Sequence, residues 1–180
     1  MSNVLVVTSS LRGKSNSDIL ANKVLEGAQE TGHNVELISL KGKNIKFCIG
    51  CMSCANTGKC VLQDDVNEIR EKVKNADTLV FVTPIYYYEM SGQLKTFLDR
   101  MNPLYDSDYK FKNVYMLTCA WDTDKNSPNR AVNGLQGWVD CFERATLVDS
   151  IFFGGMSDPA EAAKKPEALK LAFEFGRKLK

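Results

Sequence analysis

The sequence predicts one α/β domain over residues 1–180, built on a five-stranded, doubly wound parallel sheet with helices on both faces. Two observations support this prediction. Five short apolar runs rich in Val, Ile, Leu and Phe alternate with segments whose apolar residues recur at helical spacing, and 180 residues suit a single domain. Because strands that alternate with crossover helices form parallel sheets, we expect the strand order 2-1-3-4-5. A ligand then binds at the carboxyl ends of the strands.

The first part of the chain supplies three strands, each followed by a helix. Strands are expected at Val4–Thr8, Val35–Ile38 and Thr78–Thr83. Helices are expected at Ser17–Thr31, over the segment with Val66, Ile69, Val73 and Ala76, and over the segment with Leu94, Phe97, Leu98 and Met101. Asp65 and Glu68 are expected to form a capping box at the second of these helices, and Ser91 to cap the third.

The second part of the chain continues the alternation. Strands are expected at Val114–Thr118 and Thr146–Phe153, with a helix between them inside Arg130–Ala145. A last helix is expected to begin at Asp158 as N-cap, with Pro159 in its first turn, and to run towards Lys180. Pro166 is expected to interrupt or restart this helix.

The charge and the apolar segments disfavour several classes of function. A formal net charge of +1 gives no electrostatic reason to expect nucleic acid or an anionic membrane as a partner. We expect no signal peptide and no membrane-spanning helix, and therefore a cytoplasmic protein with reduced thiols. His33, the only histidine, falls at an expected helix-to-strand turn, which disfavours a histidine-dependent hydrolase.

Four of the six cysteines fall within thirteen residues, at Cys48, Cys51, Cys54 and Cys60. Two consecutive C-x-x-C steps and a fourth cysteine bring four sulfurs within reach of one cluster, whereas paired zinc knuckles need a longer spacer. The alternatives are a dithiol reductase that uses Cys51 and Cys54, and four ordinary thiols in a loop. Cys119 is expected at a strand end and Cys141 inside a buried helix face, both without a metal-ligand role.

The loop after the first strand, Ser9–Ser17, carries four serines, an asparagine and two cations, and it runs into a helix. Free backbone N–H groups and the helix dipole favour an anion at a helix N-terminus. The loop matches neither G-x-x-x-x-G-K-[ST] nor G-x-G-x-x-G, so a single phosphate fits better than a triphosphate or a pyrophosphate. The alternative is a polar turn in which Asn16 or Ser17 is the N-cap.

Aromatic residues gather in the loops after the third and fourth strands. Pro84–Met90 holds three consecutive tyrosines, and Cys119–Asp124 holds Trp121. Aromatic rings beside exposed backbone amides suit a flat, conjugated ligand with polar edges. The alternatives are one tyrosine in the core with the others at a subunit contact, and Trp121 in the core or at an interface.

Three motifs together resemble a known family. They are Ser-Ser-x-Arg-x-x-Ser-Asn-Ser from Ser9, Cys-x-Gly-Cys-x-x-Cys before Asp64-Asp65, and Pro84-x-Tyr86 followed by Gln93 to Arg100. Over about residues 3 to 118 the chain resembles the flavodoxin-like NAD(P)H-dependent FMN reductases, and its cysteine spacing is similar to that of the iron–sulfur flavoproteins. One departure is Leu11, because family members usually carry proline before the arginine.

The resemblance implies an FMN enzyme that takes a hydride from NAD(P)H and reduces a flavin, a quinone or a similar flat acceptor. It implies no catalytic side chain, because the flavin carries the chemistry. It implies that Ser9, Arg12, Ser15, Asn16 and Ser17 hold the FMN phosphate. The isoalloxazine ring is then expected beside Pro84, Ile85, Tyr86 and Tyr87, and beside Cys119, Ala120 and Trp121.

The resemblance also implies an alternative function for the cysteine run. In the iron–sulfur branch, Cys48, Cys51, Cys54 and Cys60 would hold a [4Fe–4S] cluster, and the protein would exchange electrons with a ferredoxin-like partner. Relatives with similar cysteines are also described as simple flavin enzymes, so the FMN reductase and the cluster-containing electron carrier remain the two alternatives. The family further implies a homodimer or a larger homo-oligomer.

Overall fold

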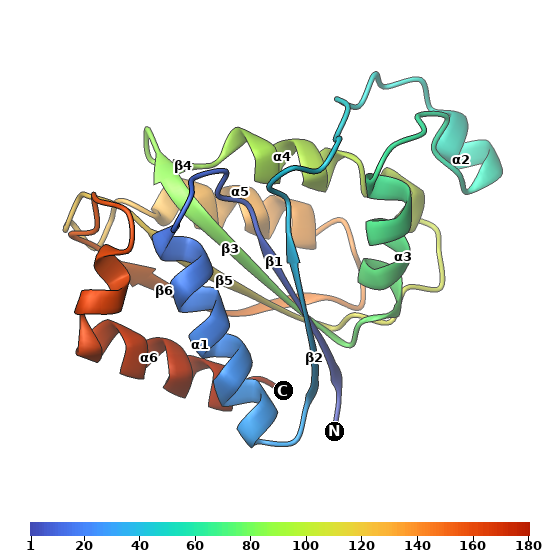
Figure 1. Ribbon diagram of the computed structural model, residues 1–180. Helices are drawn as coiled ribbons and strands as arrows, with labels where there is room; N and C mark the ends of the chain where they lie inside the picture. Colours follow the sequence, from blue (N-terminus) through green and yellow to red (C-terminus); the bar gives the residue numbers. More distant parts are fainter.

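The structure is a computed structural model that describes residues 1–180. Its centre is a parallel sheet in the spatial order β2-β1-β3-β5-β6, and the short strand β4 pairs antiparallel with the end of β3 (Figure 1). The strands are β1 (Asn3–Thr8), β2 (Asn34–Ser39), β3 (Thr78–Tyr86), β4 (Glu89–Met90), β5 (Asn113–Cys119) and β6 (Thr146–Phe153). Counted along the parallel strands alone, this is the predicted order 2-1-3-4-5, so the predicted fold class is confirmed.

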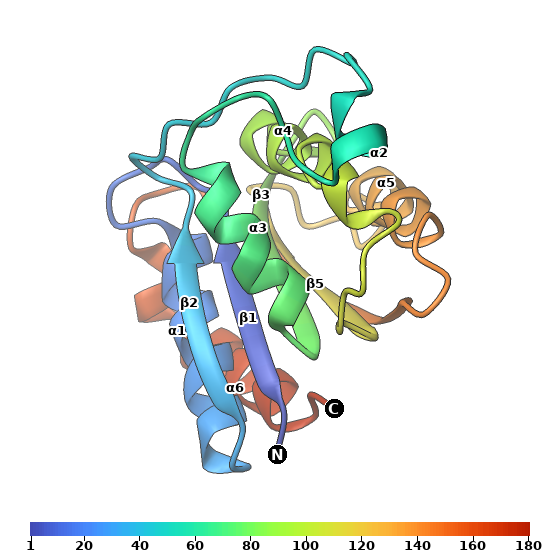
Figure 2. The ribbon, with the colours of Figure 1, turned by 90° about the vertical axis from the view of Figure 1, so that its right-hand side faces the viewer.

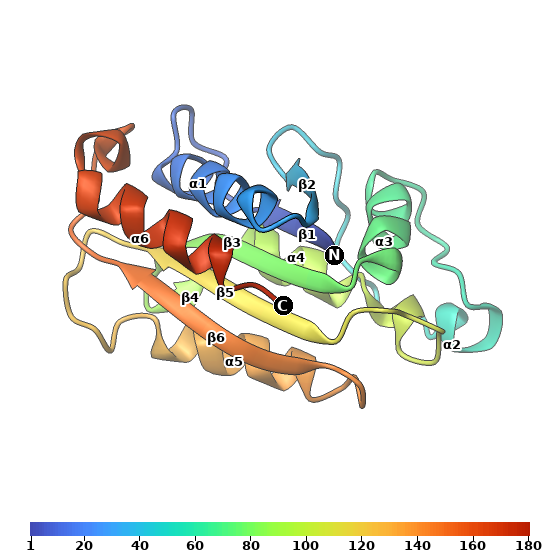
Figure 3. The same ribbon diagram turned by 90° about the horizontal axis from the view of Figure 1, so that it is seen from below.

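Helices cover both faces of the sheet, as Figure 3 shows from below. They are α1 (Asn16–Glu30), α2 (Ser53–Thr57), α3 (Val66–Asn75), α4 (Gly92–Asp99), α5 (Asn129–Val139) and α6 (Pro166–Arg177), with the 3-10 helices η1 (Asn102–Leu104) and η2 (Glu161–Lys164). One apolar core lies between the sheet and α1 with α6, and a second lies between the sheet and α3, α4 and α5. None of these helices has the length and apolar character needed to cross a membrane.

The central strands β1, β3 and β5 are nearly continuous apolar runs because helices cover both of their faces. Their fully buried stretches are Val4–Val7, Leu79–Val82 and Val114–Leu117. The register pairs Thr8 with Val82 and Pro84 with Cys119, so the carboxyl ends of the three strands lie side by side at one edge of the sheet. This edge is where a doubly wound sheet binds its ligand.

Helices α1 and α6 touch backbone to backbone. A Cβ atom placed on Gly27 would lie 2.1 Å from the carbonyl oxygen of Phe173, and one placed on Gly176 would lie 2.1 Å from the carbonyl oxygen of Val24. No side chain fits at either contact, which explains why both positions are glycine. This close packing joins the C-terminal half of α1 to α6, while the segment before α6 is held at the start of α1 by hydrogen bonds to Asn16.

Two sequence predictions about helix starts are wrong. Asp65 occupies the N-cap position of α3 but forms no capping box, because its carboxylate accepts the N–H of Asn44 at 2.7 Å, and it is the Asp64 carboxylate that accepts the Val66 N–H at 3.2 Å. The last helix begins at Pro166, which was expected to interrupt or restart it, and not at Asp158. The Glu161 carboxylate accepts the N–H groups of residues 157 and 158, which folds that stretch into a turn that leads into η2.

Candidate functional site

Three loops gather at the carboxyl edge of the sheet, where the register aligns the ends of their strands. They follow β1, β3 and β5, and they lie at the upper left of the molecule in Figure 1. The loop after β2, which carries the cysteine run, leaves the same edge but extends to the other side of α4. The structure therefore brings together the three loops that were predicted to hold a flat phosphate-bearing ligand, and sets the cysteine run apart from them.

The loop after β1 presents backbone donors at the start of α1. Ser15 is the N-cap, and its Oγ accepts the N–H of Asp18 at 3.3 Å. Each N–H group from Gly13 to Ser17 donates to no acceptor in the protein. Lys14 has a left-handed φ of 53°, the kind of turn that aims successive N–H groups into an anion-binding nest. Together with the positive end of the helix dipole, these donors suit a phosphate.

Two of the serine side chains expected at the phosphate are already bonded inside the protein. The Ser9 hydroxyl donates to the Val82 carbonyl at 3.3 Å and accepts the Ser91 hydroxyl at 2.8 Å, which joins the loop after β1 to the start of α4. Ser17 Oγ lies 3.2 Å from the Cys119 sulfur, which joins α1 to the end of β5. Both residues position the loop, while the free donors at the edge are its backbone N–H groups.

Asn16 and Arg12 connect the same loop to the segment before η2. The Asn16 amide donates to the Asp158 carbonyl at 2.9 Å, and its Oδ1 accepts the Ala162 N–H at 2.9 Å. Arg12 is exposed and donates to the Ser157 carbonyl. Asn16 is thereby committed to the fold, whereas the Arg12 guanidinium keeps further N–H donors at the surface.

The three tyrosines form the end of a β-hairpin. Strand β3 continues to Tyr86 and pairs with β4, and the two turn residues Tyr87 and Tyr88 have φ values of 51° and 69°. Two consecutive left-handed residues make the tight hairpin turn that normally selects Asn-Gly, so bulky residues here are strained. The rings of Tyr86, Tyr87 and Tyr88 are 54%, 97% and 53% exposed, so none of them lies in the core. Pro84 and Ile85 are half-buried at the base of the hairpin.

The loop after β5 adds a fourth exposed aromatic ring to this edge. Ala120 pairs with β6 through the carbonyl of Phe153, at 3.1 Å, while the Trp121 side chain is 78% exposed. Burial raises the pKa of the Cys119 thiol to about 11, against the hydrogen bond from Ser17, so this thiol is protonated at neutral pH. The edge therefore offers exposed aromatic rings and backbone amides, and Cys119 contributes no thiolate.

The four clustered cysteines line one small cavity of about 20 Å³. Cys48 and Cys51 are exposed, and Cys54 and Cys60 are half-buried. None of them forms a disulfide, and no three metal-ligating side chains converge closely enough to hold an ion. Helix α2 begins after a left-handed Met52 with φ of 57° and packs beside η1, at the right-hand end of the molecule in Figure 1, the side that faces the viewer in Figure 2. Three exposed apolar side chains also line this cavity, namely Ile49, Met52 and Val61.

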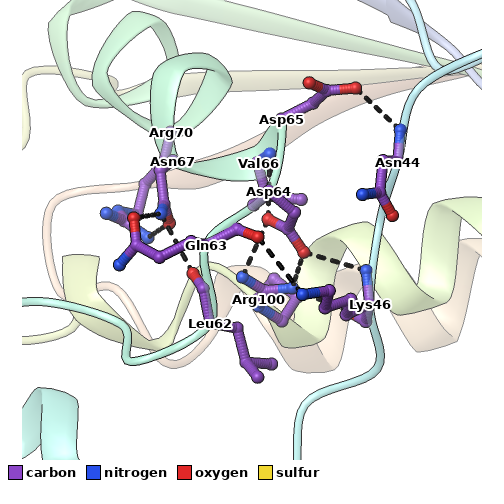
Figure 4. A network of polar contacts seen from close by, with 10 residues as sticks. All are labelled: Asn44, Lys46, Leu62, Gln63, Asp64, Asp65, Val66, Asn67, Arg70 and Arg100. Atoms are coloured by element: carbon purple, nitrogen blue, oxygen red, sulfur yellow. Dashed lines mark hydrogen bonds and ion pairs between the residues drawn. The ribbon is translucent and has the colours of Figure 1, made fainter.

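A buried ion pair closes the base of this segment, which we define as the cysteine segment, residues 47–63. The Arg100 guanidinium binds both carboxylate oxygens of Asp64, at 2.6 and 3.0 Å, and donates to the Lys46 carbonyl at 2.7 Å (Figure 4). The Lys46 N–H donates to the same carboxylate at 2.9 Å. Desolvation raises the pKa of Asp64, but the hydrogen bonds from Arg100 and Lys46 outweigh it and hold that pKa below its ordinary value.

Sequence reasoning assigned no role to Asp64 and Arg100. The sequence indicates this pair only weakly. An Asp pair stands just before α3 and an Arg just after α4, and only the fold brings these opposite charges together. The expectation that Cys141 is buried is wrong, because α5 ends at Val139 and Cys141 is exposed in the turn that follows. His33 lies between α1 and β2, at the opposite edge of the sheet, and its Nδ1 bonds the Ser2 hydroxyl at 2.6 Å.

Comparison with known proteins places this geometry in a family. A family model described as NADPH-dependent FMN reductase matches residues 2–156. The iron-sulfur flavoprotein of Methanocaldococcus jannaschii is 40% identical over 156 residues, which cover 87% of this chain and 77% of the relative. The match includes the loops after β1, β3 and β5 as well as the cysteine segment.

Solved structures show the same fold at lower sequence identity. The NAD(P)H:quinone oxidoreductase from Methanothermobacter marburgensis superimposes with a TM-score of 0.72 at 20% identity, over 98% of this chain and 96% of that one. An azoreductase from Bacillus anthracis gives a TM-score of 0.72 at 17% identity, over 99% and 100% of the two chains. At these identities the similarity concerns the fold alone.

Proposed function

The chain belongs to the NADPH-dependent FMN reductase family, and we propose that it passes electrons from NAD(P)H through FMN to a flavin, a quinone or a similar flat acceptor. The observation that supports this most directly is the composition of the carboxyl edge. Exposed aromatic rings of the tyrosine hairpin and of Trp121 flank a loop whose backbone N–H groups have no acceptor. Such an edge suits a flavin and a second flat molecule that bind in turn.

In this proposal the FMN phosphate binds the N–H groups from Gly13 to Ser17, with Arg12 as the nearby cation. The free donors and the helix dipole of α1 support the placement. Ser9, Asn16 and Ser17 contribute by holding the loop in shape, since their side chains already have protein partners. One such loop accounts for one phosphate, so we expect FMN and not FAD.

The flavin ring then lies beside Pro84, Ile85, Tyr86 and Tyr87 on one side and beside Cys119, Ala120 and Trp121 on the other. Bound FMN supplies the hydride and electron transfer chemistry. The chain supplies orientation and backbone donors, and it presents no acid–base pair at this edge. Cys119 is protonated, and the Asp122 carboxylate is occupied by the Asp124 N–H at 3.0 Å and by the Ser127 hydroxyl.

Anaerobic mixing tests the proposed reaction. NADH or NADPH should bleach the absorbance of the FMN-loaded protein within one turnover time, and a quinone should restore it. A preparation loaded with FAD in place of FMN serves as the control, and it should bind less flavin. If neither nucleotide bleaches the flavin while reduced ferredoxin does, the proposed hydride donor is wrong and the protein is an electron carrier.

A second function is favoured by the cysteine segment: we propose that Cys48, Cys51, Cys54 and Cys60 hold a [4Fe–4S] cluster that exchanges electrons with a ferredoxin-like partner. Four thiols that line one cavity without a disulfide are a suitable donor set. The cavity has room for about one water molecule, so the segment must open for the sulfurs to take up a cluster. The name of the Methanocaldococcus relative supports the same assignment.

Iron analysis tests the cluster. Anaerobic reconstitution should give four iron atoms and four acid-labile sulfides per chain, and Cys54→Ala should abolish both while FMN binding persists. Cys141→Ala is the matched control, because this exposed cysteine lies outside the four. Reconstituted protein without iron, with FMN reduction intact, would leave a flavin-only reductase.

We also propose that the protein is a cytoplasmic homodimer or larger homo-oligomer, and that residues 1–180 act as one domain. Three exposed tyrosines on one hairpin support a contact between copies, since large exposed aromatic patches are uncommon on monomers. Light scattering across a concentration series tests the assembly. A monomeric mass at all concentrations would contradict it.

A further inference from the structure

Arg100 lies beneath the cysteine segment with its side chain fully buried. Nη1 donates to Asp64 and to the Lys46 carbonyl, and Nη2 donates to Asp64. Its Nε–H is also buried but has no hydrogen-bond partner. A buried donor without an acceptor is unfavourable, and in a native fold such a group calls for an explanation.

The unpaired Nε–H belongs to a guanidinium that lines the same cavity as the four cysteines. Desolvation lowers the pKa of Arg100, but the hydrogen bond and charge of Asp64 and the nearby Cys60 raise it above its ordinary value. Cys60 and Arg100 line the same cavity, and no hydrogen bond joins Nε–H to the Cys60 sulfur in this structure. A small displacement of the segment would complete that contact.

We propose that Arg100 is a positioning residue for the cysteine segment, whose Nη groups fix both ends of the segment and whose Nε–H donates to the sulfur of Cys60. This inference rests on the proposed cluster function. Lys46 precedes the segment and Asp64 follows it, so one guanidinium joins its two ends. The remaining N–H groups of the same rigid fork, on Nε and Nη2, are then left for a sulfur of the segment.

The proposed contact has a chemical role once Cys60 is a thiolate. An N–H donor to a ligand sulfur stabilises the negative charge there and raises the reduction potential of an iron–sulfur cluster. Groups outside the ligand shell that orient a ligand typically change metal affinity by about 10- to 100-fold. Lysine cannot replace arginine in this role, because a single ammonium does not have three N–H directions in one plane.

The first experiment compares Arg100→Lys with Asp65→Ala in reconstituted protein. Asp65→Ala loosens the base of the segment by removing the contact to the Asn44 N–H, and leaves Arg100 untouched. We expect Arg100→Lys to release iron to a chelator about 10-fold faster than the parent and to shift the cluster potential, followed by electron paramagnetic resonance, to a more negative value. Asp65→Ala should leave the potential unchanged. Equal potentials in Arg100→Lys and the parent would overturn the proposal.

Because Arg100→Lys leaves the buried Asp64 poorly paired, a double variant guards against misfolding. Asp64→Asn with Arg100→Met removes both charges together, a replacement that buried ion pairs often tolerate. It should show the same negative shift of potential and the same faster iron release. An unchanged potential in a folded double variant would again contradict the role of Nε–H.

The second experiment uses cluster-free protein and does not depend on iron. The Arg100 Nε–H resonance should be protected from exchange with water in a ¹⁵N-labelled sample. Cys60→Ala should shift that resonance and speed its exchange, whereas Cys51→Ala should not. If iron never binds but Cys60→Ala alone moves the resonance, the cluster function fails and the Arg100 contact stands. If Cys60→Ala leaves the Arg100 Nε–H resonance and its exchange rate unchanged, the inference is overturned.

Discussion

Replacing Tyr87 with glycine should stabilise the protein and impair it as an enzyme. Tyr87 has a φ of 51°, and a left-handed conformation costs a non-glycine residue about 1–2 kcal/mol. Glycine avoids that strain but loses about 0.5–1 kcal/mol of backbone entropy on folding. The side chain is 97% exposed, so no packing is lost. The unfolding free energy should therefore rise by about 0.5–1 kcal/mol, a shift of about 1–4 °C in Tm for a domain of this size.

Thermal unfolding of the flavin-free protein measures the first effect, with Tyr86→Gly as the matched control. Tyr86 is the last residue of β3 and has no left-handed strain, so removing its ring should lower Tm. Steady-state kinetics with a quinone measure the second effect. Loss of a stacking ring worth about 1 kcal/mol should reduce kcat/KM about 5-fold. A lower Tm in Tyr87→Gly would refute the strain argument, and unchanged kcat/KM would remove Tyr87 from the acceptor site.

Three further predictions concern the loops around the sheet. Ser15→Ala removes the acceptor of the Asp18 N–H and should cost about 1 kcal/mol of stability, with weaker FMN binding by fluorescence titration; equal affinity would show that the Ser15 hydroxyl takes no part in the phosphate site. Because the fold lowers the pKa of Asp64, the ionised carboxylate stabilises the protein above about pH 4, and this stabilisation is lost as the pH falls through the folded pKa. Asp64→Asn should therefore show a smaller fall in unfolding free energy below about pH 4 than the parent. Equal falls in the two proteins would contradict this. With a pKa of about 11, Cys119 should resist alkylation at pH 8 while Cys141 reacts, as peptide mass analysis will show.

The fold could be predicted from the sequence because its signals are local and repeated. The apolar run from Val4 to Val7 predicts a buried strand whatever surrounds it. The predicted strand Thr146–Phe153 has the same first and last residues as β6. Ser91 caps α4 as expected, since its hydroxyl accepts the Leu94 N–H at 3.3 Å and cap chemistry depends on neighbours a few residues away. The periodicity then leaves few topologies open.

The candidate site was predictable only in part because its contacts are long-range. The family resemblance offers Ser9 and Ser17 as phosphate ligands, and the fold adds contacts of their hydroxyls with Val82 and Cys119 on distant strands. Asp65 fits the local rule for a helix cap, but its carboxylate bonds the Asn44 N–H from across the chain. These tertiary partners shape the site, and nothing in the local sequence indicates them.

The two proposed redox sites are separable because different residues maintain them. The base of the cysteine segment is closed by hydrogen bonds among Lys46, Asp64 and Arg100, and none of these bonds uses a sulfur. The proposed FMN site lies at the carboxyl edge of β1, β3 and β5, on the other side of α4 (Figure 1). Loss of the four thiols should therefore leave the flavin edge folded, and loss of the Arg100 ion pair should loosen the base of the cysteine segment without unfolding that edge. We therefore expect FMN reduction to persist in air when a cluster at the four cysteines is destroyed.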